Sequence, residues 1–169
     1  MEPVKIYFTR LRPGAVIPSK RAEDAGYDVY ACLDSDWLEL GPHETKPLPT
    51  GIASAFSADW YFHIGERGST GAKGISKRAG VIDSGFRGEW FILLTNLNDA
   101  PLYLFRPEAE AALREMLGGK DAVLYPTSKA IAQAMLLPVP KTVLEEISPE
   151  ALSAMRSERG EGSLGSSLK

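Results

Sequence analysis

Residues 51–64 of the chain, Gly-Ile-Ala-Ser-Ala-Phe-Ser-Ala-Asp-Trp-Tyr-Phe-His-Ile, contain two short runs typical of β-strands. Isoleucine and aromatic side chains recur in Gly51–Phe56 and Trp60–Ile64, and the polar residues between them favour a turn. Similar runs are Val4–Phe8, Tyr27–Ala31, Trp37–Leu40, Glu89–Thr95, Leu102–Phe105 and Ala130–Leu137. Short strands divided by turn residues predict an all-β sandwich or barrel, whereas a doubly wound α/β fold would need helices between most strands.

The composition excludes several classes of protein. A length of 169 residues favours one domain, and 22 Asp and Glu against 19 Lys and Arg disfavour a non-specific grip on nucleic acid. Cys32 is the single cysteine, so an intrachain disulfide and a Cys-rich zinc site are both impossible. The N-terminus lacks the apolar core of a signal peptide, and no apolar run is long enough to span a bilayer. We therefore expect a cytoplasmic protein that binds neither membranes nor nucleic acid.

Two helices are expected beside the strands. Residues Pro107–Leu117 place their apolar side chains on one face, begin with proline and are followed by Gly118, a common helix stop. The second helix is expected from about Pro149 to Met155, with Ser148 as its N-cap.

These helices define the expected domain organisation. Residues 1–155 are predicted to form a single β domain, with an insertion at 98–128 that holds the first helix. Residues 156–169 are rich in Gly and Ser and are predicted to form a flexible C-terminal arm. Within this arm, Arg159 could close over an anion, although the composition by itself favours a disordered tail.

The segment Glu66–Ile75, Glu-Arg-Gly-Ser-Thr-Gly-Ala-Lys-Gly-Ile, is a candidate phosphate-binding loop. Backbone N–H groups and hydroxyls of this kind can surround phosphate oxygens, and Arg67 could add a bidentate contact. The segment is not a Walker A loop, because the Gly-Lys-Ser/Thr order is absent. A polar surface loop is the alternative interpretation.

The segment Gly80–Glu89, Gly-Val-Ile-Asp-Ser-Gly-Phe-Arg-Gly-Glu, is a candidate catalytic turn. Asp83 follows an apolar pair, so a partly shielded carboxylate there could act as a general base. Phe86 could stack on a sugar or a base. The alternative is a β-hairpin in which Asp83 bonds its own turn amides.

Five segments, taken in order, closely resemble the five motifs of the trimeric dUTP diphosphatases. They are Ala25–Asp28, Arg67–Ile75, Gly80–Glu89, Lys129–Gln133 and Arg159–Ser167. Leu48–Ile52 also resembles the family's segment ahead of its second motif. The forms Arg67–Gly71 and Leu164–Ser167 are most similar to a branch found in Gram-positive bacteria and their phages.

This resemblance implies a distorted β jelly roll that assembles as a homotrimer, with active sites shared between subunits. It implies Mg²⁺-dependent hydrolysis of dUTP to dUMP and pyrophosphate, which keeps uracil out of DNA and supplies dUMP for thymidylate synthesis. It also implies that Asp83 activates the attacking water at the α-phosphorus, that Phe86 packs on the deoxyribose, and that Asp28 supports the phosphate and metal region without a direct protein ligand to the metal. The implied substrate-binding residues are Arg67, Gly68, Ser69, Thr70, Lys77, Gly80, Ile82, Phe86, Gln133, Arg159, Gly162, Leu164, Gly165 and Ser166.

Three positions depart from the family pattern. Gly68 stands where many members have a phosphate-binding Ser, so Ser69 or Thr70 is expected to take that role. Leu164 replaces the tail Phe that commonly stacks on uracil. The insertion at 98–128 could be a lid, a trimer contact or a surface addition, or it could bind a regulatory protein partner.

Two rival functions remain open at this point. A dCTP deaminase of the same fold would need a carboxylate on the strand after the third motif, where this chain has Leu93. A regulatory nucleotide-binding protein would need no catalysis, yet the chain keeps Asp83, Gln133 and Arg159.

Overall fold

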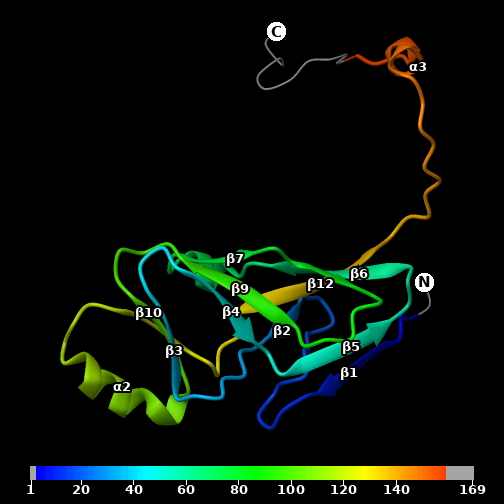
Figure 1. The fold of residues 1–169 in the computed structure, drawn as a ribbon. Coiled ribbons are helices and arrows are strands. Elements are labelled where there is room, and N and C mark those ends of the chain that lie inside the picture. Colours follow the sequence, from blue (N-terminus) through cyan, green and yellow to red (C-terminus); the bar gives the residue numbers. More distant parts are fainter. Residues whose placement is uncertain (1–2, 159–169) are drawn as a thin grey trace. The chain divides into compact units, whose positions relative to one another are not determined.

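The structure, a computed structural model, describes residues 3–158 (Figure 1). Its strands are β1 Ile6–Arg10, β2 Tyr27–Val29, β3 Trp37–Leu40, β4 Thr45–Pro49, β5 Ile52–Phe56, β6 Trp60–Gly65, β7 Ile75–Arg78, β8 Val81–Asp83, β9 Phe91–Asn96, β10 Leu102–Phe105, β11 Val123–Pro126 and β12 Ala132–Pro138. The helices are α1 Gly68–Gly71, a 3-10 turn at Pro107–Ala109, α2 Glu110–Leu117 and α3 Pro149–Ala154. The predicted all-β fold with a few short helices is confirmed.

The described strands form four small sheets. Their orders are β1-β5, β11-β10-β3, β2-β12-β6-β8 and β4-β9-β7. Pairing is antiparallel within these sheets except between β10 and β11, which run parallel. In the four-stranded sheet, Gln133 of β12 faces Asp28 of β2 on one side and Gly65 of β6 on the other. This sheet therefore places residues of the first and fourth resemblance motifs side by side, next to the end of β6, which leads into the second motif.

A cluster of apolar side chains from most of the sheets forms the core. Trp90 is fully buried, and its ring lies edge-on to Phe62 at a centroid distance of 5.1 Å. The indole N–H donates to the Ser54 hydroxyl at 3.2 Å, so burial leaves no polar atom of this ring without a partner. The neighbouring strands contribute Ile64, Ile92 and other residues to the same cluster.

Helix α2 covers a second, smaller apolar cluster beside β3 and β10 (Figure 1). Leu113 and Leu117 of the helix pack with Tyr103 and Phe105 of β10. The helix ends at Gly118, which has a left-handed φ of 56°. The predicted helix over 107–117 is confirmed, and its apolar face belongs to the folded body.

Four strands lie where no strand was expected from the sequence. The strand β4 contains Pro47 and Pro49, which are tolerated because β4 pairs with β9 alone and is an edge strand. The strand β7 begins at the last residue of the candidate phosphate-binding loop, and β8 lies in the candidate catalytic turn, for which a β-hairpin was the alternative. Gly, Ser and charged residues interrupt the apolar runs of both strands. The fourth is β11, within the segment 98–128, and its contacts with β10 are not local in sequence.

The chain divides into two compact units after Val139, which precedes the boundary expected at residue 155. In the second unit, the Ser148 hydroxyl accepts from the N–H of Ala151 at 3.2 Å and caps α3, as predicted. The predicted flexible arm falls almost wholly on residues 159–169, which lie outside the described residues. Across residues 3–158, no helix combines the length and apolar character needed to cross a bilayer.

Candidate functional site

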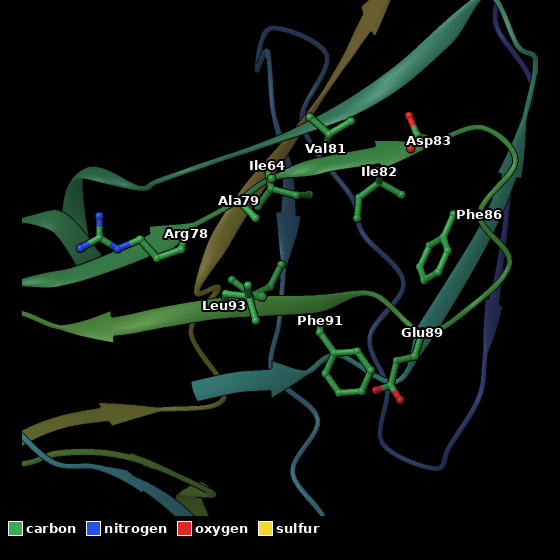
Figure 2. Close-up of a pocket in the computed structure, with 12 residues that line it drawn as sticks. Ile64, Arg78, Ala79, Val81, Ile82, Asp83, Phe86, Glu89, Phe91 and Leu93 are labelled. Carbon is green, nitrogen blue, oxygen red and sulfur yellow. The ribbon is translucent and has the colours of Figure 1, made fainter. Parts of the chain in front are cut away.

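A pocket of about 340 Å³ lies between β8 and β9, and we call it the hairpin pocket (Figure 2). Figure 2 shows Ile82 and Asp83 at the end of β8, Phe86 in the loop that follows, and Phe91 and Leu93 on β9. The full lining is Ile64, Arg78, Ala79, Gly80, Val81, Ile82, Asp83, Phe86, Glu89, Phe91, Ile92 and Leu93. Such a largely apolar wall with a few polar groups suits a small planar ring.

The turn between β7 and β8 depends on glycine at one position. Ala79 and Gly80 have φ values of 58° and 135°. The N–H of Ile64 donates to the Gly80 carbonyl at 2.7 Å, and a Cβ on Gly80 would lie 2.8 Å from the Ile64 carbonyl oxygen. A side chain at this position would push β6 and the hairpin apart.

The residues expected beside the base are only partly in the hairpin pocket. Gly80, Ile82 and Phe86 line it. Lys77 is not part of the lining, and its Nζ donates to the Ala79 carbonyl at 2.8 Å. In the described chain, Lys77 therefore supports the turn rather than facing the pocket.

The carboxylate of Asp83 is exposed at the end of β8 (Figure 2). Its main-chain carbonyl accepts from the N–H of Phe86 at 3.1 Å. Its side chain makes no hydrogen bond or ion pair with residues 3–158, so the alternative in which it bonds its own turn amides is not observed. A carboxylate without such a partner is free to accept a proton.

The other acidic residue of the hairpin pocket, Glu89, is already engaged. It accepts from the N–H of Gly51 at 2.7 Å and from Arg12 Nη2 at 2.6 Å. The hydrogen bond that Arg12 donates to Glu89 is the largest factor that raises the pKa of the Arg12 guanidinium. Leu93 adds an apolar wall where a deaminase would need an acid.

A second, polar pocket of about 690 Å³ lies at the opposite edge of the four-stranded sheet, and we call it the arginine pocket. Its lining is Ser19, Lys20, Arg21, Glu23, Asp24, Ala25, Gly26, Asp28, Arg67 and Gln133. The structure thus brings together the expected residues Asp28, Arg67 and Gln133, from three separate segments.

The guanidinium of Arg67 is held along one edge. Its Nε lies 3.3 Å from Asp28 Oδ1, and its Nη1 donates to the Ala130 carbonyl at 3.0 Å. Its Nη2 has no hydrogen bond with any described residue. Since a guanidinium carries five N–H donors, an edge remains for the oxygens of an anion.

The side chain of Gln133 is positioned by close packing against Gly26. Its Nε2 donates to the Glu66 carbonyl at 2.7 Å. A Cβ on Gly26 would lie 2.8 Å from Gln133 Oε1, so glycine is needed for this approach. The close approach of the Gln133 side chain thus explains why Gly26, in the first resemblance motif, is a glycine in this chain.

Ser69 and Thr70 have different roles in the helical turn α1. The Thr70 side chain is buried, and its hydroxyl donates to the Arg67 carbonyl at 2.9 Å. The N–H of Arg67 lies 3.3 Å from the same hydroxyl oxygen. Ser69 is exposed, so the geometry favours Ser69 over Thr70 as the hydroxyl available to a ligand.

The two pockets lie far apart within one chain and share no lining residue. Asp83 is on β8 and Asp28 is on β2, at opposite edges of the sheet. Along β6, Asp83 is level with Tyr61 and Asp28 is level with Gly65, so the two residues are also displaced along the strand direction. With strand spacings near 4.8 Å and about 3.4 Å per residue, the separation is roughly 20 Å. Within one chain, the two sets of residues are therefore well separated.

Comparison with known proteins gives matches along most of the chain. The profile of the dUTPase family matches residues 12–106. The deoxyuridine 5'-triphosphate nucleotidohydrolase of Gloeobacter violaceus is 31% identical over 171 residues, which cover 99% of each chain. The corresponding protein of Leptospira interrogans is 40% identical over 101 residues, or 57% of this chain and 69% of that protein.

The chain belongs to the dUTPase family.

A solved structure supports the same fold. The dUTPase of Staphylococcus bacteriophage 80alpha with dUPNHPP superposes with a TM-score of 0.72 at 20% identity, over 98% of this chain and 99% of that chain. The family and enzyme class expected from the five segments are confirmed, and the phage structure is consistent with the expected branch.

Magnesium, which the dUTPase resemblance implies, fits the chemistry of the arginine pocket. No group of three His, Cys, Asp or Glu side chains within residues 3–158 could form a protein-only metal site. The pocket does contain the carboxylates of Glu23, Asp24 and Asp28, of which Asp24 pairs with Arg21 and Asp28 with Arg67. Mg²⁺ that arrives on phosphates and keeps its waters needs only one or two carboxylates, so this donor set suits it.

Two features of this dUTPase site were missed in the sequence. Lys20 and Arg21 line the arginine pocket just ahead of Ala25–Asp28, and Arg21 pairs with Asp24 at 2.9 Å, which lowers the pKa of that carboxyl. Two adjacent cations before the first motif were the available signal. Glu66 begins the candidate phosphate-binding loop but was assigned no role, and it lines neither pocket. Its main-chain carbonyl accepts from Gln133, and its carboxylate accepts from the Ser76 hydroxyl at 2.6 Å, a bond that lowers the pKa of Glu66.

Proposed function

We propose that this chain hydrolyses dUTP to dUMP and pyrophosphate in the cytoplasm, in a Mg²⁺-dependent reaction. The reaction would keep uracil out of DNA and supply dUMP for thymidylate synthesis. The observation that carries the proposal is the free carboxylate of Asp83 at the mouth of an apolar pocket of nucleoside size. Family membership names the substrate that such a pocket would accept.

The hairpin pocket supports binding of the deoxyuridine part. A uracil ring fits between β8 and β9, beside the turn at Gly80. The ring of Phe86 is partly exposed at the pocket and would pack on the deoxyribose, leaving no room for a 2′-hydroxyl. Packing of this kind needs the face of the ring and no phenol oxygen.

The arginine pocket supports binding of the phosphates. The free edge of Arg67 would contact phosphate oxygens, with Gln133 beside it. Ser69 is not part of the lining, but its exposed hydroxyl, two residues after Arg67, would add a contact. Asp28 would face hydrated Mg²⁺, which when bound neutralises charge on the phosphates. The roles proposed for Arg159, Gly162, Leu164, Gly165 and Ser166, as an arm that closes over the γ-phosphate and the base, concern residues outside the described ones.

A complete site requires a second chain. Because the two pockets are roughly 20 Å apart across the sheet, each site of the proposed homotrimer would combine the hairpin pocket of one subunit with the arginine pocket of another. The trimer is proposed from the family resemblance, and the separation of the two pockets supports sites that are shared between subunits.

The proposed reaction begins with a water held by Asp83. The carboxylate accepts a proton from the water while the water oxygen attacks the α-phosphorus. The bond from that phosphorus to the bridging oxygen breaks, and pyrophosphate leaves. Arg67 and the other phosphate contacts stabilise the charge that develops on the oxygens.

The experiment is pyrophosphate release with Mg²⁺ from dUTP, dCTP, dTTP and UTP, with the base products identified. Turnover of dUTP alone is the expected result. A uracil nucleotide formed from dCTP would instead support deamination. Binding of dUTP without turnover would favour a regulatory role, and a partner of that kind would be sought at the insertion 98–128.

A further inference from the structure

Tyr125 connects the insertion to the arginine pocket. It lies on β11, is 2% exposed, and its hydroxyl donates to the Ala130 carbonyl at 2.7 Å. The ring packs in the main core, so the position of the hydroxyl is fixed by burial of the whole side chain. The insertion thus delivers one buried polar atom to the segment Lys129–Gln133.

The Ala130 carbonyl also accepts from Arg67. Its oxygen receives Arg67 Nη1 at 3.0 Å as well as the Tyr125 hydroxyl. A carbonyl oxygen has two lone pairs, so these two donors satisfy it completely. The next N–H, that of Ile131, donates to the Val29 carbonyl at 2.8 Å and fixes the peptide to β2. The carbonyl is therefore held from both sides while it holds Arg67.

We propose that Tyr125 is a positioning residue for Arg67 and that this is a function of the insertion. The inference rests on the proposed function, since it concerns the arginine that would bind the substrate phosphates. Tyr125 orients the Ala130 carbonyl, and the carbonyl together with Asp28 orients the guanidinium. The remaining edge of Arg67 is then presented in one direction, which reduces the side-chain entropy lost on binding an anion.

The test is the substitution Tyr125→Phe, which keeps the ring and removes the hydroxyl. The matched control is Tyr103→Phe: Tyr103 is also buried, lies on the adjacent strand β10 and faces Glu39 instead of the site. Binding of the non-hydrolysable analogue dUPNHPP is measured by calorimetry with Mg²⁺. We expect Tyr125→Phe to raise the Kd by about 3- to 10-fold, the usual size for one hydrogen bond, and Tyr103→Phe to leave it within about 2-fold.

A double-mutant cycle separates positioning from general loosening of the fold. Lysine at position 67 keeps the charge but cannot hold the carbonyl and present a flat edge at once. In the Arg67→Lys background, adding Tyr125→Phe should therefore raise the Kd by less than about 2-fold. An equal, additive loss in that background would overturn the inference, as would an unchanged Kd for Tyr125→Phe or an equal loss in Tyr103→Phe.

The same measurements distinguish failure of this inference from failure of the proposed function. If the unsubstituted protein neither binds the analogue nor releases pyrophosphate from dUTP, the proposed function fails. If the unsubstituted protein binds the analogue and hydrolyses dUTP, and Tyr125→Phe binds the analogue with the same Kd, only the positioning role fails.

Discussion

Asp83 offers a carboxylate that no described residue engages, and this sets the first prediction. Asp83→Asn keeps the shape of the side chain and removes its ability to accept a proton. We expect kcat for dUTP to fall by about 10²- to 10⁴-fold while the Kd for dUPNHPP changes little. Steady-state pyrophosphate release and calorimetry measure the two quantities.

Asp99→Asn is the matched control for that substitution. Asp99 is fully exposed and bonds His43 at 3.0 Å, and neither residue lines either pocket. This variant should keep normal kcat. Near-normal turnover of Asp83→Asn would refute the role assigned to Asp83.

The neighbouring hydroxyls of α1 should separate binding from stability. Ser69→Ala is expected to raise KM for dUTP by several-fold without changing the melting temperature, because the exposed hydroxyl has no structural partner within the described residues. Thr70→Val should instead lower the free energy of unfolding by about 1 to 3 kcal/mol, since its buried hydroxyl caps the turn. Thermal melts and KM values measure the two effects. A loss of stability in Ser69→Ala, with a raised KM and unchanged stability in Thr70→Val, would contradict the assignment.

Glu66 gives a prediction about pH. Its folded-state pKa is lowered, first by the Ser76 hydroxyl and then by the N–H of Lys77. The ionised form is therefore favoured by folding, and its stabilising contribution is present above the unfolded pKa and is lost as pH falls through the folded pKa. The difference in stability between the unsubstituted protein and Glu66→Gln should be largest above about pH 5 and shrink below pH 4. Denaturant unfolding at several pH values tests this, and a constant difference would contradict it.

At the scale of elements, the sequence predicted most strands but only part of the site. The run at Leu102–Phe105 was recognised because its four apolar side chains are consecutive, and all four are buried. The run at Trp37–Leu40 was recognised from three apolar side chains, of which only that of Leu40 is buried. The strand β4 was missed because edge position, which makes its prolines tolerable, is a property of the sheet and not of the segment.

The family motifs predicted which residues share the site, but they did not predict the hydrogen bonds that hold those residues in place. That Arg67, Asp28 and Gln133 would share a pocket was implied by the resemblance. The contact from Tyr125 to Ala130 depends on how the insertion packs, and no local pattern encodes it. The burial of Thr70, which separates it from Ser69, likewise appears only in the folded chain.

Helix α2 allows a test of whether the segment 98–128 contributes to the stability of the fold. Leu113 is fully buried against β10, so Leu113→Ala should lower the free energy of unfolding by about 2 to 5 kcal/mol. Met116 lies on the same helix and is 48% exposed, so Met116→Ala should change it by less than about 0.5 kcal/mol. Equal, small effects would mean that α2 is a surface addition that the body does not need.

At the scale of the whole molecule, the central claim is that each active site is built from two chains. Asp83 lies at one edge of the four-stranded sheet, whereas Arg67 lies in the pocket at the other edge. Asp83→Asn and Arg67→Ala should therefore each inactivate a homotrimer while damaging different halves of the site. In a mixed trimer, some sites would combine the intact hairpin pocket of an Arg67→Ala chain with the intact arginine pocket of an Asp83→Asn chain.

The most direct test is to co-express Asp83→Asn and Arg67→Ala chains with different tags and to purify the mixed trimers. In a purified mixed trimer, one of the three shared sites should combine the two intact halves, and this should restore about a third of the unsubstituted rate of dUTP hydrolysis. Mixed trimers no more active than either parent would show that the hairpin pocket and the arginine pocket do not combine across subunits.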